Sequence, residues 1–307
     1  MKIVLSGGTG FIGVPLCHYL HSAGNHVVVL SRAAAAARRS LPAATEVIEW
    51  SAATWPRALD GADAVINLAG ESLAGGRWTA ARKDAIRRSR CRTTADLVAA
   101  MAQAQPSPPV FISASAVGYY GPHGDEVLDE SAPPGGDFLA TVCSAWEHEA
   151  QRAEPLGVRV VRLRLGVVLG TGGGALSRMA LPFKLFAGGP LGRGEQWLSW
   201  IHRDDVIGLI GFALECPTLT GPVNATAPEP WRMREFCRTL GRVLGRPSWL
   251  PVPGFTLRLA LGEMAQMLLT GQRVIPAAAE RAGYRFRYPT LEAALRQVLD
   301  CPRLTAP

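Results

Sequence analysis

Three glycines near the start of the chain have the spacing of a turn that binds phosphate groups. Gly7, Gly10 and Gly13 follow the apolar run KIVLS and precede a segment of helical periodicity. In such a turn the first glycine permits the tight bend, the second lets the backbone approach a pyrophosphate, and the third lets the helix pack against the strand. Free amides at the helix start then face the phosphates. The spacing therefore predicts a dinucleotide site.

The end of the second expected strand, HVVVLS (26–31), distinguishes between the two nicotinamide dinucleotides. NAD sites usually carry Asp or Glu about 20 residues after the glycines, to bind the ribose hydroxyls. Ser31 and Arg32 stand at that place, and the neighbouring sequence holds no carboxylate. An arginine can pair with a 2′-phosphate and stack on adenine, and Arg38 or Arg39 could add a second contact. We expect NADP(H) to be preferred over NAD(H); the alternative is that Arg32 is an ordinary surface residue.

Alternating strands and helices must position these residues. Apolar runs predict strands at 2–6, 26–31, 46–50, 62–69 and 109–115, and a sixth within 158–170. Helical periodicity predicts helices at 11–23, 79–101 and 138–152. This order predicts an α/β fold, a Rossmann-type doubly wound parallel sheet with right-handed crossovers.

The texture of the sequence changes after Gly170, where glycine-rich stretches at 170–177 and 188–196 predict flexible loops. We expect a dinucleotide-binding domain at residues 1–169, to which 204–226 returns. Residues 170–203 and 227–307 are expected to form a smaller α+β substrate domain over the carboxyl ends of the strands.

Composition excludes several classes of protein. Of the 307 residues, 48% are hydrophobic and 19% charged, which excludes a disordered chain. No apolar run approaches the roughly 18 residues of a membrane span, and the glycine turn comes too early for us to expect a signal peptide. The six cysteines form no CxxC pair and no Cys/His metal spacing. We expect reduced, mostly buried thiols, no metal and a cytoplasmic protein.

The net charge of +7 suits an anionic partner. Residues 77–92 alone carry seven cations and one acid, Asp84, which read in isolation predicts a helix that binds nucleic acid or an acidic ligand. Helical spacing spreads these cations over several faces, so no single basic stripe forms. We therefore expect a small-molecule substrate, no nucleic acid and no membrane, and a monomer or homodimer.

Several motifs together resemble the extended short-chain dehydrogenase/reductase family, the NAD(P)-dependent epimerases and dehydratases. They are SGGTGFIG (6–13), NLAG (67–70), FISASAVGYYG (111–121), RLGVVLG (164–170) and WIHRDDV (200–206). Residues 70–90, 188–202 and 221–228 are similar to one subgroup, uncharacterised "epimerase family" proteins with a distinct C-terminal domain of unknown function.

The resemblance implies roles for residues that match its motifs. Beside the three glycines, it implies backbone contacts to the pyrophosphate from Thr9, Phe11 and Ile12. Beyond the fourth strand it places Leu68, Ala69 and Gly70 beside the adenine ribose. Arg90 falls where the family has an Asn near the cofactor ribose. At the end of the fifth strand stand Ser113 and Ser115, and Ser115 matches the serine that hydrogen-bonds the reacting oxygen.

The family's acid/base pair, Tyr-x-x-x-Lys, is absent. The residues four places after the five tyrosines, at 19, 119, 120, 284 and 288, include no lysine. Aligning Glu147 with the acidic residue that commonly follows the motif puts Leu139 at the tyrosine position and Cys143 at the lysine position. This matters because a phenol needs a nearby cation to act at neutral pH.

Other side chains could replace the pair. Tyr119 and Tyr120 lie a few residues past Ser115 and could face the nicotinamide, or could simply fill the cleft wall. Cys143 could be a nucleophile, although a buried thiol is expected. His202 could be an acid, although a positional role is expected.

Two functions follow from these residues. The first is an NADP(H)-dependent oxidoreductase or epimerase-like enzyme that exchanges a hydride with a small polar substrate, with Ser115 and a tyrosine polarising the reacting oxygen. The second is a non-catalytic NADP(H)-binding sensor or regulatory protein, which the missing lysine favours. A nucleic-acid binder ranks last.

Overall fold

A computed structural model describes residues 1–300 of the chain. Its centre is a seven-stranded sheet of order β11-β7-β5-β4-β1-β2-β3, in which every neighbouring pair is parallel. The Rossmann-type doubly wound α/β fold expected from the sequence is confirmed. The strands are β1 (Lys2–Ser6), β2 (His26–Ser31), β3 (Glu46–Glu49), β4 (Ala64–Asn67), β5 (Val110–Ala116), β7 (Arg159–Leu165) and β11 (Gly221–Ala225).

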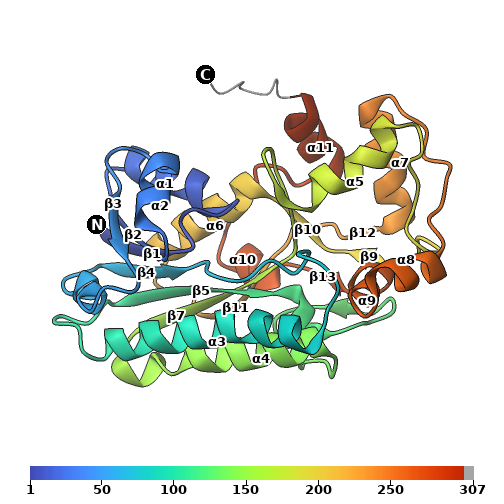
Figure 1. The fold of residues 1–307 in the computed structure, drawn as a ribbon. Coiled ribbons are helices and arrows are strands. Elements are labelled where there is room, and N and C mark those ends of the chain that lie inside the picture. The colour runs from blue at the N-terminus through green and yellow to red at the C-terminus, as the bar shows by residue number, and fades with distance from the viewer. Residues whose placement is uncertain (301–307) are drawn as a thin grey trace.

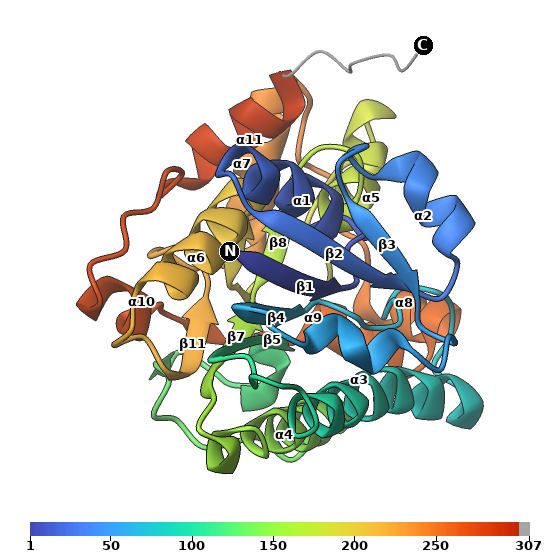
Figure 2. The ribbon, with the colours of Figure 1, turned by 90° about the vertical axis from the view of Figure 1, so that its left-hand side faces the viewer.

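Helices cover both faces of this sheet (Figures 1 and 2). On one face lie α1 (Gly13–Ser22), α2 (Ala34–Ser40) and α6 (Arg203–Glu215), and on the other lie α3 (Ala80–Met101) and α4 (Phe138–Gln151). The strands β1, β2 and β4 are largely apolar on both sides, as a doubly covered sheet requires. In β1, Leu5 packs with Leu16 of α1, whereas its neighbour Val4 packs with Leu97 of α3.

The C-terminal part, residues 170–203 and 227–300, has its own apolar core, in which Phe183, Trp200, Phe236 and Leu295 are fully or almost fully buried. Its helices are α5 (Gly174–Lys184), α7 (Met233–Leu244), α8 (Gly254–Leu261), α9 (Met264–Leu269), α10 (Ala277–Arg281) and α11 (Leu291–Asp300). Among residues 1–300, six short strands outside the central sheet pair two by two, and two of them, β6 and β8, come from earlier in the chain. The pairs are β8 (Val167–Leu169) with β10 (Trp200–His202), β9 (Trp197–Leu198) with β12 (Trp231–Arg232), and β6 (Val127–Leu128) with β13 (Arg273–Val274). Short 3-10 helices occupy Trp55–Leu59, Val117–Tyr120 and Glu154–Leu156.

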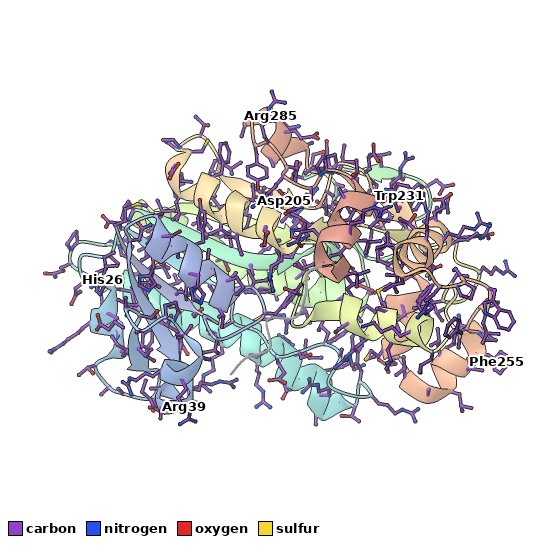
Figure 3. The ribbon with its side chains drawn as sticks, turned by 90° about the horizontal axis from the view of Figure 1, so that it is seen from above. His26, Arg39, Asp205, Trp231, Phe255 and Arg285 are labelled. Atoms are coloured by element: carbon purple, nitrogen blue, oxygen red, sulfur yellow. The ribbon has the colours of Figure 1, made fainter. Side chains whose placement is uncertain are left out.

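This C-terminal part lies beyond the carboxyl ends of the central strands. Seen from above, His26 at the start of β2 lies toward one end of the molecule, and Trp231 and Phe255 lie toward the other (Figure 3). Asp205, in the first turn of α6, lies between them. One local expectation was wrong: the glycine-rich stretch at 170–177 is not all loop, because α5 begins at Gly174. None of the helices that the structure describes combines the length and apolar character needed to cross a membrane.

Candidate functional site

A cleft of about 570 Å³ opens over the carboxyl ends of β1, β4 and β5. One end is formed by the glycine turn and by Leu68 and Gly70, which follow β4. The other end is formed by residues 114–118 after β5 and by Trp197 and Met267 of the C-terminal part. In open parallel α/β sheets, ligands bind in such a crevice outside the strand ends. The fold therefore brings the predicted phosphate turn and the C-terminal part to one cavity.

The three glycines are required for different reasons. A Cβ on Gly7, whose φ is 76°, would lie 2.6 Å from the carbonyl carbon of Leu68, and one on Gly13 would lie 2.3 Å from the oxygen of Gly7. A Cβ on Gly10 would meet one atom within 4 Å, the Gly7 oxygen at 3.2 Å. Gly7 and Gly13 therefore permit the fold of the turn itself, whereas Gly10 leaves space in the cleft. The start of α1 has no side-chain cap, which leaves its amides available to a phosphate.

Two free guanidinium groups follow β2 in the sequence, one directly after the strand and one in the last turn of α2. Arg32 and Arg39 are exposed and make no hydrogen bond or ion pair within residues 1–300, whereas Arg38 donates to the carbonyl oxygen of Val47 at 3.0 Å. The Ser31 hydroxyl accepts from the amide of Ala33 at 3.2 Å. The sequence around Arg32 holds no carboxylate, but the fold brings one close to Ser31. Glu49 ends β3 directly beside Ser31, because the two strands pair in parallel register.

Arg90 of α3 reaches the cleft next to Gly70. A Cβ on Gly70 would lie 3.2 Å from the guanidinium carbon of Arg90, which also lies 5.3 Å from the ring centre of Trp146. Arg90 donates to the carbonyl oxygen of Ile86 at 3.1 Å, and burial lowers its pKa. The structure thus brings together two residues that lie twenty positions apart in the sequence, and both line the cleft.

Ser115 lines the cleft, but its hydroxyl is already engaged. It donates to Oε1 of Glu147 at 2.7 Å, and Glu147 forms a bidentate pair with Arg164 at 2.8 and 2.9 Å. All three side chains are buried. Because the proton of Ser115 points at a carboxylate, its remaining capacity toward a ligand is that of an acceptor. Ser113 is also buried, with a long hydrogen bond of 3.4 Å to the carbonyl oxygen of Ala114.

The two tyrosines expected to face the nicotinamide do not line the cleft. Tyr120 is fully buried, donates to Oδ1 of Asn224 at 2.6 Å and accepts from Arg164 at 2.9 Å. Burial raises the pKa of Tyr120 to about 12. The ring centre of Tyr119 lies 3.5 Å from the Arg164 guanidinium carbon. The reason is that both follow β5 in a 3-10 helix, Val117–Tyr120, which turns them toward β7 and β11.

Helix α4 presents three residues at one-turn spacing along one side. Leu139 and Cys143 line the cleft, and Glu147 lies one turn further on beneath Ser115. Burial raises the pKa of the Cys143 thiol to about 12, so this thiol is neutral at physiological pH. In the sequence, Glu147 serves to align the chain with the family motif, and no role in the site is predicted for it. The same helical spacing that joined it to Leu139 and Cys143 could have indicated that it lies near the cleft.

His202 has a structural position away from the cleft lining. It is buried, its Nδ1 accepts from the amide of Asp204 at 3.1 Å, and its Nε2 lies 2.8 Å from Oε1 of Gln297. It therefore caps the start of α6 as a neutral ring, and burial lowers its pKa. The described cysteines are free thiols, and Cys301 lies outside the described residues.

Two family models match the sequence. The model described as "NAD dependent epimerase/dehydratase family" matches residues 3–224, and a domain of unknown function, DUF1731, matches residues 252–298. The epimerase family protein SDR39U1 homolog, chloroplastic, of Arabidopsis thaliana is 44% identical over 304 residues, covering 98% of this chain and 87% of that protein. Epimerase family protein YfhF of Bacillus subtilis is 42% identical over 302 residues, covering 97% and 98%.

Solved structures give the same result. The crystal structure of human epimerase family protein SDR39U1 (isoform2) with NADPH matches at a TM-score of 0.90 and 36% identity, covering 98% of this chain and 100% of that one. A UDP-glucuronic acid 4-epimerase from Bacillus cereus in complex with NAD shares the fold, with a TM-score of 0.76 at 19% identity. Since a model of this family matches most of the chain, and relatives above 40% identity align along nearly its whole length, the protein belongs to the NAD-dependent epimerase/dehydratase family.

Proposed function

We propose that this protein is an NADP(H)-binding oxidoreductase of the epimerase/dehydratase type that acts on a small molecule held between the central sheet and the C-terminal part. The observation that carries the proposal is the continuous cleft, which joins the uncapped start of α1 to a chamber walled by both parts of the chain. The exposed, unpaired Arg32 and Arg39 favour the 2′-phosphate of NADP(H) over the free hydroxyl of NAD(H). The NADPH bound to the human relative supports the same choice.

Each residue of the proposed site has a distinct role. The amides of the glycine turn hold the pyrophosphate, Arg32 pairs with the 2′-phosphate, and Arg90 lies beside the ribose. Bound NADP(H) supplies the hydride exchange. Ser115, held by Glu147, offers its lone pairs to a hydroxyl at the reacting carbon and so orients that group.

A non-catalytic NADP(H) sensor is the second candidate. It is favoured by the absence of any Tyr, His or Lys side chain among the described residues that line the cleft. The two candidates differ in turnover. Protein loaded with NADPH is mixed with a panel of aldehydes, ketones, quinones and nucleotide sugars, and the absorbance of the reduced nicotinamide is followed. Oxidation with any member supports the enzyme, whereas no oxidation at intact NADPH affinity supports the sensor.

A single substitution tests the cofactor site. Gly10→Ala should abolish NADPH binding in calorimetry and change the unfolding temperature far less than Gly13→Ala, because its added methyl meets one protein atom, at 3.2 Å, and would occupy the place proposed for the pyrophosphate. Gly124→Ala is the matched control, since a Cβ there has nothing within 4 Å, and it should change neither quantity. If Gly10→Ala binds NADPH as the natural protein does, the proposed cofactor site is wrong.

A further inference from the structure

The end of the cleft remote from the glycine turn is apolar. Its walls are formed by Leu139 and Val142 of α4, Val167 of β8, Trp197 of β9, and Met267 of α9. These elements come from both parts of the chain, so this chamber is built by the tertiary fold. In the family pattern stated above, Leu139 stands where an ionisable tyrosine is expected.

Several polar side chains at this end already make hydrogen bonds within the protein. The hydroxyl of Ser199 donates to the carbonyl oxygen of Gln272 at 2.8 Å and accepts from the amide of Val274 at 3.0 Å. The Thr270 hydroxyl donates to the carbonyl oxygen of Gln266 at 2.9 Å. Asp137 caps α4 by accepting from the amide of Ala140 at 2.8 Å. The Ser199 and Thr270 hydroxyls therefore have their protons engaged within the protein, and the Asp137 carboxylate can accept but not donate, so these groups do not suit an anionic ligand.

Cationic groups are also missing from the chamber. Among the described residues that line the cleft, Arg90 is the one cation, and it lies beside Gly70 at the cofactor end. Arg232 and Arg273 lie outside the lining, over the ring of Trp197, with their guanidinium carbons 4.5 and 4.7 Å from its centre. A diphosphate in this chamber would lose its hydration without gaining a charged partner, which is unfavourable.

The wall is also rigid. The two arginines hold the ring of Trp197, and its indole nitrogen donates to Oδ1 of Asp125 at 2.9 Å. Because these contacts already hold the Trp197 side chain, a ligand that packs beside it does not incur the entropy cost of ordering that side chain. Because the dinucleotide occupies part of a 570 Å³ cleft, the space left for a substrate is small.

We propose that this chamber, made by Leu139, Val142, Trp197 and Met267, binds a compact, uncharged, apolar compound whose reacting carbon carries a carbonyl or a hydroxyl group, such as an aromatic ketone or quinone or the corresponding alcohol. This inference rests on the proposed oxidoreductase function and gives its substrate a chemical class. It replaces the small polar substrate expected from the sequence, and it excludes a nucleotide sugar.

Calorimetry with menadione and UDP-glucose tests the inference on the full chain, once saturated with NADP⁺ and once without cofactor. Menadione should bind in both titrations and UDP-glucose in neither. Trp197→Ala and Met267→Lys should each weaken menadione binding by about tenfold or more while NADPH affinity stays unchanged. Trp249→Ala, which removes an exposed tryptophan outside the cleft, is the matched control and should leave menadione binding unchanged.

Each other outcome overturns a defined part. The proposed ligand class of the chamber is refuted if UDP-glucose binds more tightly than menadione. It is also refuted if neither substitution changes the affinity for menadione. Met267→Lys keeps this test open if Trp197→Ala does not fold. Failure of NADPH to bind refutes the proposed cofactor function instead, and the titration without cofactor still decides the chemistry of the chamber.

Discussion

At the scale of single residues, the surroundings of a guanidinium decide what it can bind. Arg164 is buried between Glu147 and the two tyrosines, and it donates to Glu147, to Tyr120 and to the carbonyl oxygen of Glu130. The N–H groups of Arg164 are engaged in these hydrogen bonds within the protein. The contacts with Glu147 and Tyr120 raise the pKa of Arg164 although burial lowers it. Arg32 has the same chemistry but is exposed and unpaired within residues 1–300. Arg164 therefore stabilises the fold, while Arg32 is left for a ligand.

Arg32→Asp should weaken NADPH binding by about tenfold or more and leave NADH binding unchanged or improved. The substitution removes a charge-assisted contact worth about 1.5–3 kcal/mol and puts a carboxylate against the 2′-phosphate. Titration of both dinucleotides measures the effect. Arg285→Asp makes the same change of charge on the α10–α11 connection, well away from Arg39 in Figure 3, and should have no effect. Unchanged NADPH affinity in Arg32→Asp would refute the assignment.

The two adjacent tyrosines should differ in how much stability is lost when their hydroxyls are removed. Tyr120→Phe leaves Oδ1 of Asn224 buried without its donor, so we expect a loss of about 1–3 kcal/mol in the free energy of unfolding. Tyr119→Phe removes a hydroxyl with no hydrogen bond within residues 1–300 and should change stability by less than about 0.5 kcal/mol. Denaturant unfolding measures both. Neither variant should alter NADPH binding. A loss of NADPH affinity in either variant would show that a tyrosine hydroxyl contributes to the cofactor site.

At the scale of elements, the basic helix α3 shows how the fold neutralises a charged segment. Arg88 and Arg92 pair with Asp84 and Asp96 of the helix itself. Arg82 pairs with Glu71, and Lys83 pairs with Glu263, which lies 180 residues away in the sequence. The cations of this segment are thus spread over several faces and largely paired, and Arg90 turns into the cleft. The segment offers no continuous basic stripe.

Helix α4 carries a buried and a half-buried glutamate that can be compared directly. Glu147→Gln should lower the free energy of unfolding by about 3–5 kcal/mol, because it leaves the Arg164 charge buried without its counter-ion. Glu149→Gln breaks an exposed pair with Arg152 and should cost less than about 1 kcal/mol. Urea unfolding of the two variants measures the difference. Equal losses would mean that the Glu147–Arg164 pair does not hold α4 to β7.

The cap of α6 should make stability depend on pH. Burial lowers the pKa of His202 below its ordinary 6.5, so below about pH 6.5 the unfolded chain binds more protons and stability falls. Asp204 and Asp205 oppose this shift without cancelling it. His202→Asn keeps an acceptor for the amide of Asp204 and removes the titration, so its stability should fall less between about pH 7 and pH 5.

Chemical denaturation at a series of pH values measures this slope. His26→Asn is the control, because His26 is exposed and pairs weakly with Glu46. Parallel curves for His202→Asn and the natural protein would show that His202 does not titrate in this range.

At the scale of the whole molecule, the central sheet and the C-terminal part share both a cleft and a core. Ala279 of α10 belongs to the same hydrophobic cluster as Leu5 of β1, and β11 joins the sheet after a long excursion of the chain. The buried carboxylate of Glu130 accepts from the amides of Asn224 and Ala278 and so ties these regions together. The two parts are therefore expected to unfold together.

NADPH should stabilise the entire molecule. At a concentration about 100 times its Kd, a ligand that binds the folded state alone adds about 2.7 kcal/mol to the free energy of unfolding. Scanning calorimetry should show one transition that moves to higher temperature as a unit. Two transitions, one of them unmoved by NADPH, would show that the C-terminal part folds independently and that the cleft does not couple it to the sheet.

The sequence by itself determined the strand–glycine turn–helix unit, the parallel sheet and the arginine after β2. These features depend on residues that are near one another in the sequence. They are a tight bend, a helix start, and continuous apolar runs that suit a sheet covered on both faces. Their signals are therefore complete within a few tens of residues. The family motifs extended this prediction to Gly70 and Arg90, which the structure places side by side.

Tertiary structure alone decided which side chains reach the cleft. Tyr120 follows Ser115 by five residues, yet its hydroxyl lies against Asn224, because β5, β7 and β11 stand next to one another in the sheet. Glu49 lies beside Ser31 for the same reason, through the register of β2 and β3. The apolar chamber joins residues of α4, β9 and α9 that are each more than 50 positions apart in the chain. Such contacts between distant residues depend on strand order and helix packing, which no local sequence pattern encodes.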